Sequence, residues 1–225
     1  MALVAPSLLA ADFAHLAEAL HLMKEAGASM VHVDVMDGHF VPDITVGQPV
    51  VRSLRSATDL VLDVHLLVER PERYTAEFVD AGADRVTVHA AATPHLHRVL
   101  EEIRACGAKA GVALDPATPV ESLADLLEEI DFLSVLAADP GFPEQAFIPR
   151  SVAKVEAACS AREERVLDFA IQVEGGIGLD HLEELLRAGA DILVAGSAIF
   201  HTDDPKAQLR EMIRLASTRR QTFRV

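Results

Sequence analysis

The chain has 225 residues, half of them hydrophobic and only 4% aromatic, so its core must be built from Ala, Val, Leu and Ile. Its formal charge of −15 argues against phosphate backbones and anionic lipid head groups as partners, because binding either one needs a basic surface. We therefore expect no nucleic-acid or membrane role.

Cysteine content and the N-terminus bear on the cellular compartment. The chain contains Cys106 and Cys159, far apart and each in a helical pattern, so we expect two reduced, buried thiols and no disulfide framework. The opening MALVAPSLLAADF has no basic region before its short apolar run, and no apolar stretch approaches the roughly 20 residues of a membrane span. The sequence predicts a cytoplasmic protein.

Apolar runs alternate with amphipathic helical patterns along the whole chain. The phrases EAGASMVHV, DAGADRVTV, ACGAKAGVAL and RAGADILVA each join a helix, ended by a glycine, to a buried strand. Read in the same way, the other apolar runs complete a set of eight strands. They are expected near residues 4–8, 30–35, 60–66, 85–89, 110–114, 132–136, 169–174 and 192–195.

Eight strand–helix units without a linker or composition shift favour a closed parallel barrel over an open sheet. We predict an α/β protein with a (β/α)8 TIM-barrel fold, forming a single domain over residues 1–225, with residues from about 216 to 225 as a loose tail. Two longer stretches, VMDGHFVPDITVGQP and AADPGFPEQAFIP, are expected to be loops after strands two and six. Such loops build the active sites of barrels.

Polar residues interrupt the apolar strands near their carboxyl ends. His32 and Asp34 are two residues apart, so both point to the same face of strand two, and His65 follows the same pattern on strand three. If these faces point inward, the three side chains converge near the barrel mouth, and Glu174 at the end of strand seven can complete the set. Two imidazoles and two carboxylates suit one divalent Zn, Mn or Fe ion, with Asp63 one layer deeper as support.

The alternative is that these residues are hydrogen-bonded structural groups or caps, although burying several unpaired polar groups in a barrel is costly. For His39, His89, His95 and His97 we expect surface positions or contacts to the ligands rather than to the ion. Ser7, at the end of strand one, can either bind a substrate or cap the next helix.

Two glycine-containing loops point to an anion site. VEGGIG follows strand seven and VAGSAIF follows strand eight, which places Gly175, Gly176, Gly196 and Ser197 in the two loops that hold phosphate in many barrels. Backbone N–H groups without side chains nearby admit an anion closely. Turn formation is the other explanation for a pair of glycines.

With these motifs in place, the chain resembles the ribulose-phosphate 3-epimerase family over nearly its full length. The similar segments are APSLLAADF, VHVDVMDGHFVPDITVG, LDVHLLVERPERY, HAAATPHLHR, DPGFPEQAFIP, VEGGIG and VAGSAIF. The resemblance implies a barrel of the ribulose-phosphate-binding type, one divalent metal (Zn, Fe or Mn), and interconversion of D-ribulose 5-phosphate and D-xylulose 5-phosphate. It also implies a homo-oligomer.

The resemblance assigns roles to the residues identified above. His32, Asp34, His65 and Glu174 become the metal ligands, and Asp34 and Glu174 become the acid/base pair. Ser7, His65, Gly141, Gly175, Gly176, Gly196 and Ser197 become contacts to the ketose phosphate substrate. The chemistry agrees, because inverting carbon 3 requires a carboxyl group on each face of a planar enediolate and an electrophile to stabilise its charge.

Departures from the family pattern gather near this site. Glu174 replaces an aspartate, while Leu67 and Leu136 replace methionines that cover the reacting carbon. Pro143 removes an N–H donor from the loop after strand six, and Glu144 adds a negative charge there. Ala137 and Ala138 replace polar residues.

These departures leave two alternative functions open. One is an epimerase or isomerase of the same type acting on another ketose or ketose phosphate, such as allulose 6-phosphate. The other is a barrel that binds a sugar phosphate without turning it over.

Overall fold

A computed structural model describes residues 2–141 and 145–218 of the chain. Its centre is an eight-stranded parallel sheet in the order β1-β8-β7-β6-β5-β4-β3-β2. The strands are β1 Leu3–Pro6, β2 Met30–Met36, β3 Val61–Leu67, β4 Arg85–His89, β5 Lys109–Leu114, β6 Phe132–Leu136, β7 Ala170–Glu174 and β8 Ile192–Ala195. A parallel bridge between Ser7 and His32 links β1 to β2 and closes the sheet into a barrel.

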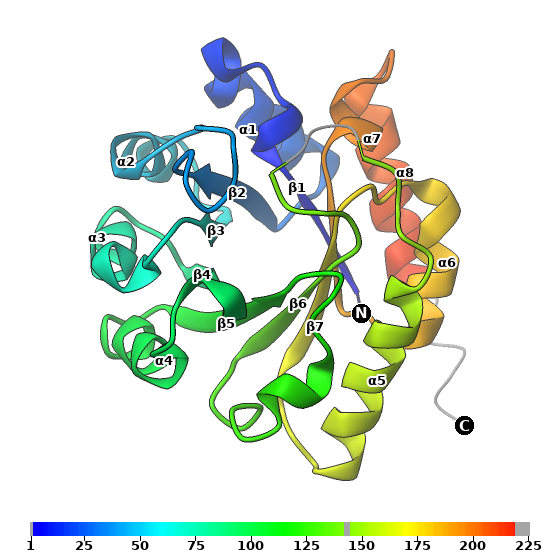
Figure 1. Cartoon of the computed structure of the whole chain (residues 1–225). Coiled ribbons are helices and arrows are strands. Elements are labelled where there is room, and N and C mark those ends of the chain that lie inside the picture. Colours follow the sequence, from blue (N-terminus) through cyan, green and yellow to red (C-terminus); the bar gives the residue numbers. More distant parts are fainter. Residues whose placement is uncertain (1, 142–144, 219–225) are drawn as a thin grey trace.

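Helices surround the strands on the outside (Figure 1). They are α1 Leu16–Ala26, α2 Gln48–Ala57, α3 Thr75–Asp80, α4 Leu96–Ala105, α5 Ser151–Glu164, α6 Leu179–Ala188, α7 Ser197–Phe200 and α8 Pro205–Thr218. Between β5 and β6 a 3₁₀ turn at Val120–Leu123 takes the place of an α-helix. The predicted (β/α)8 TIM-barrel fold is therefore confirmed, with one shortened connection.

The predicted strands agree with the observed ones to within two residues at each end. The largest difference is in β1, which ends at Pro6 because Ser7 caps a 3₁₀ turn at Leu8–Ala10. The four glycines of the repeated phrase, at positions 27, 82, 107 and 189, all have left-handed φ angles between +98° and +111°. Helix α8 continues to Thr218, and most of the predicted loose tail, residues 219–225, lies outside the described part.

The core has separate layers. A large apolar cluster fills the space between the barrel strands and the surrounding helices. A smaller one, made of Ala5, Met30, Ile192 and Val194, comes from the neighbouring strands β8, β1 and β2. Buried polar side chains lie at the same level of the barrel, because Gln172 is in register with Ile192.

One expectation about the core was wrong. Cys106 is exposed and Cys159 is only partly buried, although both are free thiols. Cys106 directly follows α4 and precedes the left-handed Gly107, so it lies where the chain turns away from the core. Within the described residues, no helix combines the length and apolar character needed to cross a membrane.

Candidate metal centre and active site

Four side chains meet at the mouth of the barrel. His32 and Asp34 project from β2, His65 from β3 and Glu174 from the end of β7. His32 Nε2 lies 3.1 Å from Asp34 Oδ1 and 3.0 Å from Glu174 Oε2, and His65 Nδ1 lies 3.2 Å from each of the same two oxygens. Both imidazoles therefore face both carboxylates.

The donor set of this cluster fits a divalent ion. One atom from each of the four side chains lies within 4.8 Å of the others, and within the described ranges no other group of His, Cys, Asp and Glu side chains has this arrangement. Nitrogen and carboxylate-oxygen donors together suit Zn, Mn or Fe. All four residues are nearly inaccessible to solvent, so a cation would compensate the buried carboxylates.

A second layer of polar groups supports His32 from below. Its Nδ1 lies 2.8 Å from Asp63 Oδ2, which also accepts a hydrogen bond of 3.0 Å from Gln172 Nε2. Arg85 donates from Nε to Asp63 Oδ1 and from Nη2 to Gln172 Oε1, both at 3.0 Å, and its guanidinium lies 3.8 Å from the centre of the Phe132 ring. This layer thus fixes the orientation of the His32 ring, and within it the charge of Asp63 is paired with that of Arg85. Such supporting groups are expected behind metal-binding histidines.

His65 is supported by a second histidine. Its Nε2 lies 2.9 Å from Nε2 of His89, and the two rings stack at 4.9 Å. His89 is fully buried, with its Nδ1 2.9 Å from Asp115 Oδ1 and its other face 4.8 Å from the ring of Phe40. His89 therefore contacts His65, one of the residues expected to bind the ion, and is not at the surface.

Each carboxylate of the cluster has a serine on its remaining oxygen. Ser7 Oγ donates a hydrogen bond of 2.8 Å to Asp34 Oδ2, and Ser134 Oγ donates to Glu174 Oε1. Ser7 Oγ also accepts from the N–H of Leu9, so it caps the 3₁₀ turn as well. Its capping role is therefore present, together with a contact to Asp34.

The charges of the cluster shift every pKa within it. Burial favours neutral imidazoles, but the facing carboxylates outweigh this effect and raise the pKa of His65 to about 9, and that of His32 well above its ordinary value. Burial likewise opposes ionisation of Asp34 and Glu174, yet the two imidazoles hold the pKa of both carboxyl groups well below the usual range. In the metal-free protein both acids are therefore ionised.

The glycines predicted to bind an anion lie just beyond β7 and β8. Gly175 and Gly176 have left-handed φ angles of +101° and +65°. A Cβ at Gly175 would come within 2.7 Å of the backbone nitrogen of Ala138, and one at Gly176 within 2.7 Å of that of Phe147. Both positions thus need glycine for the turn and for close packing against the loop after β6, independently of any anion.

The other predicted substrate contacts lie in the same region. Gly196 forms the N-terminal boundary of α7, which begins with Ser197, and a Cβ at Gly196 would lie 3.2 Å from Ala10 Cβ. Gly141 has a φ of +80°, and its Cα packs so close to Val41 that a Cβ would lie 2.2 Å from that side chain. Pro143 and Glu144 lie outside the described residues.

Leu67 and Leu136 keep the mouth of the barrel apolar. Leu67 is buried and packs with Met36 and Val41, against which Phe40 also packs. Leu136 is buried at the end of β6, in register with Glu174.

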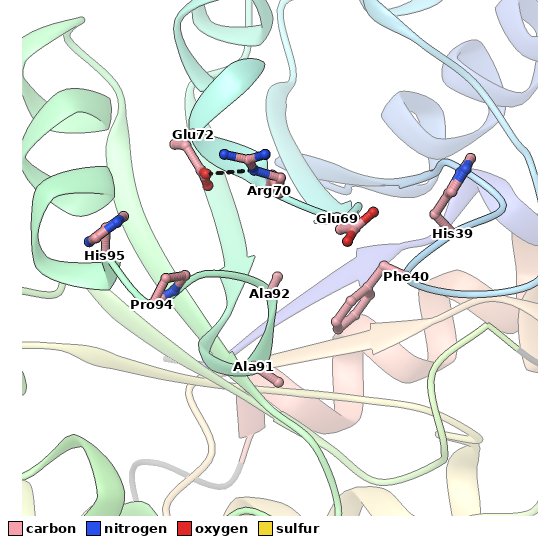
Figure 2. A pocket seen from close by; sticks show the side chains of 9 residues that line it. All are labelled: His39, Phe40, Glu69, Arg70, Glu72, Ala91, Ala92, Pro94 and His95. Carbon is pink, nitrogen blue, oxygen red and sulfur yellow. Dashed lines mark hydrogen bonds and ion pairs between the residues drawn. The ribbon is translucent and has the colours of Figure 1, made fainter.

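A separate cavity of about 530 Å³ lies among the loops that follow β2, β3 and β4. Figure 2 shows His39 and Phe40 on one side of it and Pro94 and His95 on the other, with Glu69, Arg70 and Glu72 along its edge. None of the four cluster residues lines it, although Phe40 separates it from His89. His39 and His95 are exposed, as expected.

Sequence reasoning missed Ser134 and Gln172. Both are completely buried polar residues in the middle of apolar strands. Their signal is the period of two: Gln172 shares the inward face of Glu174, and Ser134 lies opposite Gln172 in the register of β6 with β7. A search for polar residues on that face would have found them.

Comparisons with known proteins agree with this geometry. The family model described as "Ribulose-phosphate 3 epimerase family" matches residues 3–200. The chain is 45% identical over 214 residues to a protein of Mycobacterium tuberculosis named ribulose-phosphate 3-epimerase, covering 95% of this chain and 93% of the other. It is 44% identical over 210 residues to a Bacillus subtilis protein of the same name, covering 93% and 97%.

Solved structures provide a wider comparison of the fold. A structure described as KGPDC from Streptococcus mutans superposes with a TM-score of 0.70 at 18% identity, covering 96% of this chain and 99% of the other. At this identity the likeness concerns the barrel alone. The family match and the identity of the relatives go further: this chain belongs to the ribulose-phosphate 3-epimerase family, a family of isomerases.

Proposed function

We propose that this chain is a metal-dependent epimerase that inverts carbon 3 of D-ribulose 5-phosphate to give D-xylulose 5-phosphate. The observation that carries the proposal is the shared orientation of Asp34 and Glu174, whose oxygens face the same pair of imidazoles from two different strands. The names of the relatives support the choice of substrate.

In this proposal His32, Asp34, His65 and Glu174 hold one divalent ion. The ion supplies a Lewis acid that stabilises negative charge developing on the ketone and hydroxyl oxygens of the substrate. The residues behind the ligands keep the cluster rigid, because Asp63 fixes the His32 ring and His89 fixes the His65 ring.

The two carboxyl groups divide the proton transfer. Asp34, as a carboxylate, takes the proton from carbon 3 on one face. Glu174, which is ionised in the metal-free protein, takes up a proton from solvent before turnover and returns it to carbon 3 on the opposite face. The C–H electron pair is held meanwhile in an enediolate, and re-protonation forms the new C–H bond. In the reverse reaction, from D-xylulose 5-phosphate to D-ribulose 5-phosphate, Glu174 acts as the base and Asp34 as the acid. Proton exchange with solvent returns the two carboxyl groups to their starting protonation states.

The substrate phosphate is assigned to the loops after β7 and β8. Gly175, Gly176, Gly196 and Ser197 would contact it through backbone N–H groups, with Gly141 on the loop after β6. His65 and Ser7 lie at the cluster and would bound the reacting end of the sugar, and Leu67 and Leu136 would cover it with apolar surface.

An isotope experiment tests the proposal. The protein is freed of metal by chelation, loaded in turn with Zn²⁺, Mn²⁺ or Fe²⁺, and incubated with D-ribulose 5-phosphate in deuterated water. We expect deuterium at carbon 3 and formation of D-xylulose 5-phosphate. Faster exchange with allulose 6-phosphate would reassign the substrate, and no exchange with any ketose phosphate and any metal would refute an epimerase function.

A further inference from the structure

The two carboxylates of the cluster are held in the same way, although they come from strands that are not neighbours, β2 and β7. Each directs one oxygen toward His32 and His65 and offers the other to a serine hydroxyl, Ser7 for Asp34 and Ser134 for Glu174. Ser134 is completely buried, so this hydroxyl has no contact with solvent. The arrangement fixes both oxygens of each carboxylate.

Ser134 approaches Glu174 from deeper in the barrel. In the register of β6 with β7, Leu136 lies opposite Glu174, and Ser134 lies two residue pairs below it, opposite Gln172. A hydroxyl at this depth draws the Glu174 carboxylate inward, toward the polar layer of Gln172 and Asp63. The Glu174 carboxylate is therefore bound both to the two imidazoles and to a residue deeper in the barrel.

The length of the Glu174 side chain gives the hydrogen bond from Ser134 its importance. A glutamate carries its carboxylate one methylene farther from the backbone than an aspartate does, and its terminal torsion has a broad, weakly restricted range. Without a partner for Oε1, the carboxylate could rotate or move toward solvent and lose its alignment with the two imidazoles. A charge-assisted hydrogen bond from a buried hydroxyl restricts it to one orientation.

We propose that Ser134 is a positioning residue that adapts the site to glutamate at position 174, holding the carboxylate at the depth and orientation required by the cluster. The inference rests on the proposed function for its catalytic consequence, but its effect on metal binding stands alone. Ser134 touches neither the ion nor the substrate in this scheme and acts through Glu174.

A double-mutant cycle tests the proposal. The variants are Ser134→Ala, Glu174→Asp and the combination, with Thr75→Val as the control that removes another fully buried hydroxyl, in α3 outside the barrel. Two quantities are measured: Co²⁺ affinity and absorption spectrum by titration of the metal-free protein, and kcat and KM for deuterium exchange at carbon 3.

We expect Ser134→Ala to lower Co²⁺ affinity and kcat by about 10- to 100-fold with an altered Co²⁺ spectrum and a nearly constant KM. In the Glu174→Asp background, where the shorter side chain no longer reaches the hydroxyl, the same change should cost no more than about twofold, the scatter of independent sites. Thr75→Val should leave both quantities at wild-type values.

Equal effects of Ser134→Ala in both backgrounds, or no effect on Co²⁺ binding in the wild-type background, would overturn the positioning role. Failure of the proposed function has a different signature: wild-type protein would then bind Co²⁺ without exchanging carbon 3, while the cycle in Co²⁺ affinity would still report on Ser134.

Discussion

The Nδ1 of His32 lies 2.8 Å from Oδ2 of Asp63, a carboxylate that belongs to the layer beneath the cluster. Because Asp63 also accepts hydrogen bonds from Arg85 and Gln172, one buried acid orients an imidazole of the cluster and neutralises Arg85, the cation of that layer. The stability of the fold and the geometry of the cluster are therefore linked through a single side chain.

Asp63→Asn should lower both the stability of the fold and metal affinity. It leaves Arg85 without its buried counter-charge, which costs about 3–5 kcal/mol of unfolding free energy in typical cases. Metal affinity should fall by about 10- to 100-fold, because the His32 ring loses the partner that orients it. Urea denaturation of the metal-free protein and chelator competition measure the two effects.

Asp59→Asn is the matched control for that change. Asp59 pairs with Lys24 on the surface, where both side chains are more than half exposed. Its loss should change the unfolding free energy by less than about 1 kcal/mol. Similar losses for both variants would show that the layer beneath the cluster has no special role.

Asp34→Asn should abolish exchange at carbon 3 while leaving the barrel folded. The substitution removes a base and a ligand, and general acid–base catalysis alone contributes about 10²- to 10⁴-fold. The amide has nearly the same volume as the carboxyl group and still accepts the Ser7 hydrogen bond. Exchange rate and far-UV circular dichroism are the measurements, and retained turnover would mean that the acid is misassigned.

Metal binding should release protons and become tighter as pH rises. The carboxylates raise the pKa of His65 to about 9, so its ring is protonated in the metal-free protein near neutral pH. A nitrogen must lose its proton to bind an ion, so affinity should increase up to about pH 9. Calorimetry in buffers of different ionisation enthalpy measures the released protons, and a buffer-independent enthalpy would contradict the assignment.

The same pKa shift gives the metal-free fold the opposite pH dependence. The folded pKa of His65, about 9, exceeds the ordinary 6.5, so its contribution to stability is complete below the lower value and is lost as pH rises through the higher one. Urea midpoints of the metal-free protein should therefore be higher near about pH 6 than near about pH 10. No decrease over this interval would show that the imidazole is neutral in the folded state.

Gly175→Ala should impair binding of the phosphate group. A Cβ there meets the backbone of Ala138 at 2.7 Å, so the loops after β6 and β7 must separate. We expect KM for the ketose phosphate to rise far more than KM for the dephosphorylated ketose, with both measured by the exchange assay.

Gly107→Ala separates backbone strain from this loop movement. Gly107 has a φ of +98°, close to the +101° of Gly175, but no atom lies within 4 Å of its Cβ position. The Gly107→Ala variant should lose about 1–2 kcal/mol of unfolding free energy, because alanine is strained in the left-handed conformation. Its KM should be unchanged. A rise in KM for Gly107→Ala as well would show that strain alone explains the result at Gly175.

The sequence by itself determined the barrel and the four members of the cluster. Each strand is an apolar run with a period of two, so His32 and Asp34 must share a face, and regular alternation with helices leaves a closed parallel barrel as the arrangement that buries every run. The carboxyl ends of parallel strands meet at one end of the barrel, which brings His65 and Glu174 to the same place.

Only the tertiary structure decided which atoms meet. The hydrogen bond from Ser134 to Glu174 depends on the register of β6 with β7, and the contact of His89 with His65 depends on the register of β4 with β3. Neither register is encoded in the spacing of residues along one strand, because each is set by packing of all eight strands around the interior. Exposure of Cys106 has the same origin, since a helix pattern does not say where the helix leaves the core.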